Sequence, residues 1–521
     1  MEYLVSAEEM RRCDSNTIEK FHVPAVVLME RAALGVVDVI KSRYNEDRGK
    51  VLIVAGTGNN GADGIAVGRM LMQEGFQVTF FLAGERARFS ELMELQVTII
   101  EAYGWEICTS FPENEYDIIV DAIFGIGLTR TLEGKFKKIV QKINERKAWK
   151  ISVDMPSGIH TDTGEVMGVA IKADATVTFA YRKLGMILYP GCYYTGKVYT
   201  KQIGITEEGF EGKLPHVFCH DEKPAELLPT RRKDGNKGTF GKVLVIAGNK
   251  EMSGACVLSA EAAFRTGCGM VRIVTDKENK AILGEKLPEA ILGLYETKEE
   301  LEEQLQKGCE WADCILVGPG CGTGKTTIEK LAFVLEKCDK PLVIDADGLN
   351  VISENFGLYN SLKKSIIEKK RAVILTPHIG EFARLSGKSI PEIKASFLQE
   401  ALSYAEECGC VLVCKDARTV VCKKGEHTYL NTTGNSGMAT AGSGDVLAGM
   451  ITGLLAQKIS AFEAAVLGVY LHGMAGDMAA LKKNEYTLMA GDLIKQFDCL
   501  FSYLEGHNGL EDRVRTRICR S

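Results

Sequence analysis

The sequence lacks an excess of positive charge. Its formal net charge is -6, with 63 Lys and Arg residues against 69 Asp and Glu residues. A protein that binds nucleic acid or an anionic membrane surface needs a basic patch to meet the phosphates. We therefore expect neither nucleic acid nor membrane among the partners of this protein.

Long apolar runs and zinc-type cysteine pairs are missing as well. The first ten residues, MEYLVSAEEM, lack the basic-then-apolar plan of a signal peptide, and no uninterrupted apolar span is long enough to cross a bilayer. The 16 cysteines are scattered, and Cys408 and Cys410, one residue apart, form no double pair with others. Reduced, buried thiols are expected. These absences favour a cytoplasmic enzyme.

The chain is long and rich in glycine. At 521 residues the chain is too long for one ordinary core, and its 54 glycines cluster after apolar runs, as in α/β nucleotide-binding folds. A polar, proline-containing stretch lies between two such regions. We predict α/β architecture with a domain over residues 1–210, a linker over 211–224, a domain over 225–505, and a disordered tail over 506–521.

The first domain opens with a strand, a glycine loop and a helix. Strand 50–55 runs into GTGNNGADG at residues 56–64, which contains the dinucleotide fingerprint Gly-x-Gly-x-x-Gly. However, the next strand, 77–82, ends in Ala-Gly and not in the acidic residue that would hold a ribose. The loop is also crowded with amides and a carboxylate, which suit hydroxyl, amide or cation binding. A dehydrogenase is therefore disfavoured.

Polar side chains follow successive strands of this domain. Asp121 ends one predicted strand, and Asp154, followed by Ser157, ends the next. Ligands bind beyond the carboxyl ends of strands in an open parallel sheet, so these residues and Asn60 are expected to converge on one pocket. Each carboxylate alone is more often a turn or cap residue. Their repetition at strand ends favours a site.

Three motifs of this region resemble the NAD(P)H-hydrate epimerase family, the N-terminal YjeF domain: GTGNNGADG (56–64), DAIFGIGL (121–128) and VDMPSG (153–158). The resemblance covers about the first 210 residues and implies a Rossmann-like three-layer α/β/α fold. It implies a potassium ion held by Asn60, Asp121 and Ser157, with Asp154 at the reacting end of the nicotinamide. Ala62 departs from the family, which usually has glycine there. The implied substrate-binding residues are Asn59, Asn60, Gly61, Ala62, Asp63, Gly125, Ile126, Gly127, Leu128, Thr129, Arg130, Thr131 and Asp154.

The second half repeats the α/β alternation. Strands are predicted at 242–247, 271–274, 314–317, 342–344, 372–375 and 411–414, with helical stretches between them. Residues 318–327 look like a P-loop, but Pro319 stands where that motif needs its first glycine. We therefore expect Lys325 to face solvent.

The most informative stretch is residues 435–449. Gly442, Ser443 and Gly444 stand directly before Asp445, and a helix-compatible run follows from 446 to 455. The unpaired N–H groups at a helix start attract phosphate, and an aspartate there suits a general base in phosphoryl transfer. An aspartate that simply caps the helix is the structural alternative.

Two other segments carry candidate ligands. His378 follows a strand end and is fixed between proline and glycine, which favours substrate contact. Residues 415–419 follow strand 411–414, and their basic side chains would meet nucleotide phosphates. An ordinary charged hairpin explains the spacing of residues 415–419 equally well.

The order of these pieces resembles the ribokinase-like superfamily and, within it, the NAD(P)H-hydrate dehydratase family, the C-terminal YjeF domain. The motifs are GPGCG (318–322), TPHIGE (376–381) and AGSGD (441–445), where the family more often has a further glycine in place of Ala441. The resemblance covers about residues 225–505 and implies ADP, bound with Mg²⁺, as cosubstrate in bacterial fused enzymes and ATP in eukaryotic ones. The implied nucleotide-binding residues are Lys415, Asp416, Ala417, Arg418, Thr419, Gly442, Ser443 and Gly444. The implied substrate contacts are Ala255, Gly320, His378 and Asp445.

Together the two resemblances predict a bifunctional nicotinamide-nucleotide repair enzyme. The first domain would interconvert the R and S hydrates of NADH and NADPH. The second would dehydrate the S form with ADP, giving AMP and phosphate, with Asp445 as base. The alternative is a small-molecule kinase fused to a non-catalytic nucleotide-binding module. NAD(P)H hydrate and ADP are the expected partners, and a homo-oligomer is expected.

Overall fold

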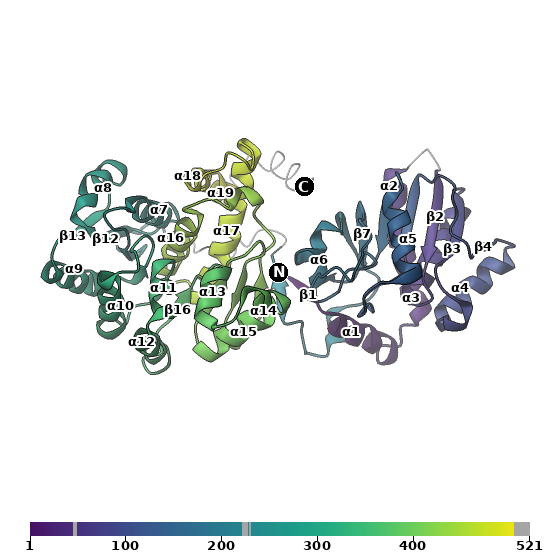
Figure 1. The fold of residues 1–521 in the computed structure, drawn as a ribbon, viewed down its shortest axis with the longest axis horizontal. Coiled ribbons are helices and arrows are strands. Elements are labelled where there is room, and N and C mark those ends of the chain that lie inside the picture. The colour runs from purple at the N-terminus through teal and green to yellow at the C-terminus, as the bar shows by residue number, and fades with distance from the viewer. Residues whose placement is uncertain (45–48, 221–227, 229–230, 505–521) are drawn as a thin grey trace. The chain divides into compact units, whose positions relative to one another are not determined.

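The computed structural model describes residues 1–44, 49–220, 228 and 231–504. The chain divides into a first unit, Tyr3–Val217, and a second unit, Phe218–Ser521 together with Met1 and Glu2 (Figure 1). The predicted tail, 506–521, lies outside the described residues. The predicted linker, 211–224, contains the short strand β10 (Val217–Cys219), and its last four residues are outside the described part.

The first unit is built on a seven-stranded sheet in which all neighbouring strands run parallel. Its order is β4 (Ile107–Cys108), β3 (Gln77–Leu82), β2 (Lys50–Ala55), β5 (Ile118–Ala122), β6 (Trp149–Val153), β7 (Ala175–Phe179) and β9 (Lys197–Lys201). The short strands β1 (Glu2–Val5) and β8 (Arg182–Lys183) also pair in parallel.

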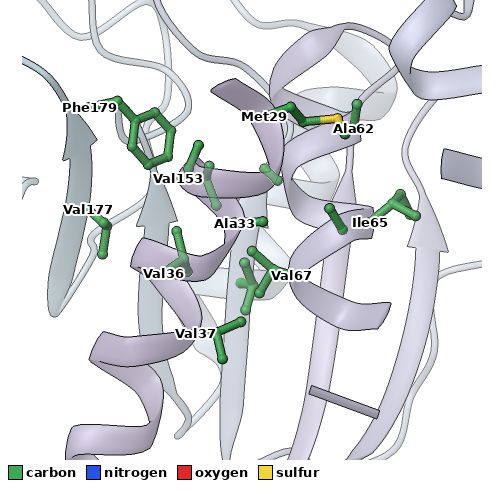
Figure 2. Close-up of a cluster of buried hydrophobic side chains, with 14 of the residues drawn as sticks. Met29, Ala33, Val36, Val37, Ala62, Ile65, Val67, Val153, Val177 and Phe179 are labelled. Atoms are coloured by element: carbon green, nitrogen blue, oxygen red, sulfur yellow. The ribbon is translucent and has the colours of Figure 1, made fainter. Parts of the chain in front are cut away.

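Helices cover both faces of this sheet, which confirms the three-layer prediction. Alternate residues of β2 separate into two apolar cores: Ile53 faces one core, and Leu52 faces the other. The first core includes α1 (Ala7–Glu19), α2 (Ala25–Arg43), α3 (Asn59–Gln73) and α4 (Glu91–Ala102). The second includes α5 (Gly134–Glu145). Figure 2 shows the first core, where side chains of α2 and α3 meet those of β6 and β7.

The sheet of the second unit is parallel from β13 to β17 and antiparallel from β17 to β19. Its order is β13 (Ile291–Tyr295), β12 (Met270–Asp276), β11 (Lys242–Ile246), β14 (Cys314–Val317), β15 (Leu342–Ile344), β16 (Val373–Leu375), β17 (Val411–Cys414), β18 (Val420–Cys422) and β19 (Thr428–Leu430). The helices are α7 (Ser253–Arg265), α8 (Lys280–Lys286), α9 (Lys298–Trp311), α10 (Lys325–Lys337), α11 (Asp347–Glu354), α12 (Phe356–Ile367), α13 (Ile379–Ser386), α14 (Ile390–Ala395), α15 (Phe397–Cys408), α16 (Ser443–Ala456), α17 (Ala461–Lys482), α18 (Ala490–Ile494) and α19 (Phe497–Leu504).

Glycines allow α16 to pack closely against α7. A Cβ on Gly449 would stand 2.1 Å from the backbone oxygen of Ser259, and one on Gly453 would stand 2.8 Å from that of Ala263. Contacts that advance together along both helices show that the helices run in the same direction. Their N-terminal ends therefore lie side by side, which brings the start of α16 next to the start of α7.

The helix α17 is, within the described residues, the one helix long and apolar enough to cross a membrane by composition. Glu463 and Asp477 interrupt its apolar sequence, so it does not contradict the expectation that no uninterrupted apolar span is long enough. However, 83% of its most apolar window is buried inside the unit (Figure 1). A mostly buried helix of this kind is explained by packing in the core of the second unit.

Candidate functional site

The first unit contains a cavity of about 140 Å³ beside α1, α2 and α3. Its walls are mainly apolar, but four charged side chains also line it: Asp14, Asp63, Asp154 and Lys183. Asn59 and Ile126, which the sequence predicted to bind substrate, reach the same cavity. An apolar pocket with a few convergent titratable groups is the usual form of a small-molecule site.

Asp154 is held in place directly after the end of strand β6. It follows β6 with a left-handed φ of 65°, a conformation that a non-glycine residue keeps only when its surroundings enforce it. Its Oδ1 accepts hydrogen bonds from Lys183 Nζ at 2.5 Å and from Thr178 Oγ1 at 3.2 Å. The Lys183 side chain is only 1% exposed. The sequence analysis did not identify Lys183, whose only sequence signal is a lysine next to a short strand.

The other two carboxyls of the cavity have no such cation. Asp63 makes no hydrogen bond or ion pair with any residue that the structure describes, and burial together with Asp154 and Asp14 raises its pKa well above the usual value. Burial and Asp154 also raise the pKa of Asp14, which Lys183 partly opposes. Asp63 therefore holds its proton more tightly than an ordinary aspartate does.

Asp121 and Ser157, predicted to share a potassium ion, are fully buried and bonded to each other. Ser157 donates its backbone N–H to Asp121 Oδ2 at 2.8 Å and its hydroxyl to Oδ1 at 2.5 Å. Ser152 donates a further bond at 2.8 Å. Burial raises the pKa of Asp121 despite these bonds. The pair is not among the residues that line the cavity, so the predicted convergence of four residues on one pocket is only partly observed.

The remaining residues of the first prediction are spread along two loops. The amide carbon of Asn60 lies 3.2 Å from the position that a Cβ on Gly125 would take, so these loops touch. The amide nitrogen of Asn60 is buried and has no hydrogen-bond partner. Gly61, Ala62 and Leu128 are buried, whereas Gly127 and residues 129–131 are exposed.

In the second unit, α16 begins at Ser443, and Asp445 lies in its first turn. Gly442 precedes the helix with φ of 87°, which glycine adopts readily. The position of a Cβ on Gly442 is 3.9 Å from the Asp445 carboxylate, and the one on Gly444 is 3.2 Å from Lys415 Nζ. The predicted helix is confirmed, beginning three residues before 446. The glycine turn (residues 442–444) therefore lies between a carboxylate and an ammonium group.

Lys415 forms an ion pair with Asp345, a carboxylate that was not predicted from the sequence. Its Nζ donates to Asp345 Oδ1 at 2.8 Å, and Thr376 Oγ1 donates to the same oxygen at 2.8 Å. Burial would lower the pKa of Lys415, but Asp345 and Glu381 outweigh it, and the pKa is raised. Asp345 follows β15 in the same way that Lys415 follows β17, so its signal in the sequence was its place at a strand end.

Asp445 has no such ion pair, and its environment makes it a stronger base than an ordinary aspartate. Burial, followed by the charge of Asp345, raises the pKa of Asp445 to about 7, while Lys415 opposes the shift. Nearby, burial lowers the pKa of His472 to about 4, and this neutral ring lies 3.4 Å from Ser443 Oγ. A carboxylate with a pKa near neutrality suits general base catalysis.

His378 has a structural task that the sequence analysis did not foresee. Its Nδ1 accepts hydrogen bonds from the backbone N–H groups of Gly380 and Glu381, at 3.0 and 3.3 Å, and so caps α13. The Glu381 carboxylate accepts the backbone N–H of His378 in return, at 2.8 Å. The His378 side chain remains 55% exposed. Its Nε2 lies 3.5 Å from Glu381 Oε1, so both ring nitrogens face groups of α13.

Two predicted substrate contacts lie together at the start of α7. A Cβ on Gly320, which has φ of 60°, would stand 2.7 Å from the Cβ of Ala255. The neighbouring Gly322 donates its N–H to Asp347 Oδ2 at 2.7 Å. Lys325 is exposed, as predicted.

Residues 415–419 form the turn of the β17–β18 hairpin. Arg418 donates to the backbone oxygen of Thr432 at 3.2 Å, and Asp416 lies 3.9 Å from the ammonium of Lys394. Asp416 and Arg418 are therefore held by other parts of the unit, as in an ordinary charged hairpin. Lys415 alone reaches the glycine turn.

Comparison with known proteins gives consistent matches in both units. A family model described as NAD(P)H-hydrate dehydratase matches residues 243–498, and one described as YjeF-related protein N-terminus matches residues 25–185. The chain is 35% identical to a bifunctional NAD(P)H-hydrate repair enzyme of Thermofilum pendens, over 93% of this chain and 94% of the relative. It is also 35% identical to that of Moorella thermoacetica, over 94% and 95%. A crystal structure of an ADP/ATP-dependent NAD(P)H-hydrate dehydratase from Bacillus subtilis is 29% identical, with a TM-score of 0.48 over 54% of this chain and 95% of that one.

Proposed function

We infer that this chain, which belongs to the family of bifunctional NAD(P)H-hydrate repair enzymes, uses both of its units to restore hydrated nicotinamide nucleotides. The first unit is the epimerase and the second is the nucleotide-dependent dehydratase. The observation that best supports this division is the arrangement around Asp445. A carboxylate with a raised pKa lies beside a glycine turn at a helix start, with an ammonium group next to it.

The dehydration requires a better leaving group than hydroxide. In the S hydrate, Asp445 takes the proton of the hydroxyl group, and the oxygen attacks the terminal phosphoryl group of the nucleotide. The P–O bond to the nucleoside phosphate breaks. The resulting phosphate ester loses phosphate as the ring nitrogen supplies its electron pair, and loss of a proton from the adjacent carbon restores the double bond.

Charge at the transferred group is met by the start of α16 and by Lys415. The backbone N–H groups of the glycine turn and the positive end of the helix would stabilise the phosphoryl oxygens. Among the described residues no three or more His, Cys, Asp or Glu side chains are arranged to hold a metal ion. Mg²⁺ would therefore enter with the nucleotide, with Asp347 and Glu381 as the nearby oxygen donors, and would neutralise phosphate charge.

ADP is the proposed phosphoryl donor, giving AMP and phosphate. The support is the family resemblance of the fused chain and the single ammonium group, Lys415, at the glycine turn. ATP is the competing donor. The assay that decides between them is dehydration of the S hydrate with each nucleotide in turn.

A potassium ion is proposed for the first unit, held by Asn60, Asp121 and Ser157. Their oxygen atoms are the ligands that hard cations prefer. The carboxylate of Asp121 accepts four hydrogen bonds, from the Ile123 N–H, the Ser152 hydroxyl and the N–H and hydroxyl of Ser157, so the ion would take the place of at least one of them. The ion would fix the loops that carry Asn60 and Gly125.

Chemically prepared R and S hydrates test the assignment directly. Without nucleotide, either epimer should give a mixture of both but no NADH or NADPH. With ADP, both should be converted completely to the reduced cofactor, which chromatography and absorbance record. A stable phosphorylated hydrate would instead indicate a kinase, and unchanged R hydrate would show that the first unit is not an epimerase.

A further inference from the structure

We propose that Asp63 and Asp154 are the two proton-transfer residues of the epimerase, and that Lys183 is a positioning residue that holds the Asp154 carboxylate in place. Asp63, Asp154 and Lys183 line one cavity of the first unit. This proposal rests on the epimerase function proposed above. It assigns a role to Lys183, which none of the three motifs of the first unit contains.

The chemistry requires one acid and one base. Water adds to a dihydropyridine double bond so that the hydroxyl group lies on the carbon next to the ring nitrogen. To invert that carbon, an acid protonates the hydroxyl, the C–O bond breaks, and the nitrogen electron pair forms a C=N bond as water leaves. Water then attacks the opposite face, and a base takes its extra proton. One proton is given and one is taken, so no oxidant or cosubstrate is needed.

Asp154 is suited to be the base because an ion pair with a buried cation fixes its carboxylate at the cavity. The Lys183 ammonium is 2.5 Å from Asp154 Oδ1 and almost completely buried. It also donates to Thr178 Oγ1 at 2.8 Å and to the Phe179 carbonyl at 3.2 Å. These three bonds use all three N–H donors of the ammonium group. Lys183 therefore has no donor left for the substrate and acts through Asp154.

Asp63 is suited to be the acid because no hydrogen bond or ion pair with the described residues stabilises its charge. It lies in the first turns of α3, in the same wall as Asn59, and has no hydrogen-bond or ion-pair partner among the described residues. Burial and the charge of Asp154 raise its pKa, which keeps a proton on it. Asp14 also faces the cavity, but Lys183 lowers its pKa in part. Asp63 is therefore the better proton donor of the two.

The variant Asp63→Asn separates this role from a structural one. Interconversion of R and S hydrates without nucleotide should fall about 10²–10⁴-fold. The midpoint of thermal unfolding of the first unit should rise, because the amide replaces a carboxyl crowded by two others. Dehydration of the S hydrate with ADP should be unchanged. Asp38→Asn, at an exposed aspartate on α2, is the matched control and should leave interconversion intact.

Near wild-type interconversion by Asp63→Asn would overturn the assignment, as would a loss produced by Asp14→Asn and not by Asp63→Asn. These outcomes differ from failure of the proposed function. If the wild-type protein does not interconvert the epimers at all, the epimerase assignment itself is wrong.

The variant Lys183→Met tests the positioning role. Interconversion should fall about 10–100-fold in kcat with little change in KM, because Asp154 loses the ion pair that fixes its carboxylate in the cavity. The titratable groups facing Asp154 in the cavity are Asp14, Asp63 and Lys183. Lys172→Met, at an exposed lysine, is the control.

A loss expressed mainly in KM would show that Lys183 is only structural, and an unchanged rate would show that it has no role. If Lys183→Met does not fold, Asp154→Asn combined with Lys183→Met removes the buried charge pair together. That double variant should be no slower than Asp154→Asn alone, since Lys183 acts only through Asp154. A further large loss would contradict the proposal.

Discussion

Both units are built on a largely parallel sheet, but the buried lysine of each unit pairs with a different kind of carboxylate. In the first unit, Lys183 pairs with Asp154, the predicted catalytic carboxylate. In the second, Lys415 pairs with Asp345, the neighbour of the predicted base, and leaves Asp445 without an ion pair. Both lysines lie at the ends of strands, and both are largely buried.

This difference corresponds to the chemistry that each unit performs. Epimerisation needs a carboxylate that stays ionised beside a carboxyl that keeps its proton, and one paired aspartate next to one unpaired aspartate provides both. Phosphoryl transfer needs a base and a place for phosphate charge. Because Lys415 pairs with Asp345, the pKa of Asp445 remains raised, at about 7. The Lys415 ammonium still lies next to the glycine turn, where it supplies positive charge.

The largest expected effect comes from Asp445→Asn. Dehydration with ADP should fall at least about 10³-fold, because the amide cannot accept the hydroxyl proton. Interconversion of R and S hydrates should be unaffected, since its residues belong to the other unit. Chromatography of the hydrates with and without ADP measures both. Dehydration close to the wild-type rate would exclude Asp445 as the base.

Replacing the second lysine should sharpen the comparison. Lys415→Met should slow dehydration by about 10²–10³-fold through loss of charge stabilisation. The acid limb of the pH profile should also move up, because Lys415 lowers the pKa of Asp445 in the native unit. Lys325→Met, at the exposed start of α10, is the control. An unshifted limb would show that Lys415 does not act on Asp445.

Potassium should matter to one unit only. Exchanging potassium for a bulky organic cation is expected to slow epimerisation roughly 10-fold or more, and Asp121→Ala should make the remaining rate indifferent to potassium. Dehydration of the S hydrate in the same samples provides the internal control. A wild-type epimerisation rate that ignores the cation would leave Asp121 as a structural residue bonded to Ser157.

The smallest effect concerns stability. The pKa of Asp445 is about 7 in the folded state and 3.8 in the unfolded state. The stability that its protonated form contributes is therefore fully present below about pH 4 and is lost as the pH rises through 7. Asp445→Asn should therefore stabilise the second unit by about 1–2 kcal/mol at pH 8 and by almost nothing near pH 4. Urea unfolding at the two pH values measures this. Equal shifts at both would contradict the raised pKa.

Regular patterns predicted the fold well. Apolar runs that ended in glycine or aspartate located β2, β5 and β6 to within two residues, because buried parallel strands need such runs. The start of α16 followed from Gly442 and Asp445 for a similar local reason. The expected homo-oligomer stays a prediction.

The sites were less predictable because their charged groups meet through the fold. Lys183 and Asp154 are 29 residues apart, and Lys415 and Asp345 are 70 apart. No local spacing signals such pairs. His378 was predicted to contact substrate, but its ring also caps α13, a role that depends on backbone geometry. The glycine loops, by contrast, were recognisable because their chemistry is local.

We infer that two separate sites in one chain perform two separate reactions. Mixing Asp445→Asn protein with Asp154→Asn protein tests it most directly, with R hydrate and ADP as the only substrates. Asp154→Asn alone should form reduced cofactor no faster than enzyme-free epimerisation supplies S hydrate, and Asp445→Asn alone should form it no faster than its residual dehydration allows. The mixture should restore rapid formation, because each protein supplies the site that the other lacks. A mixture no faster than the better single variant would contradict the account.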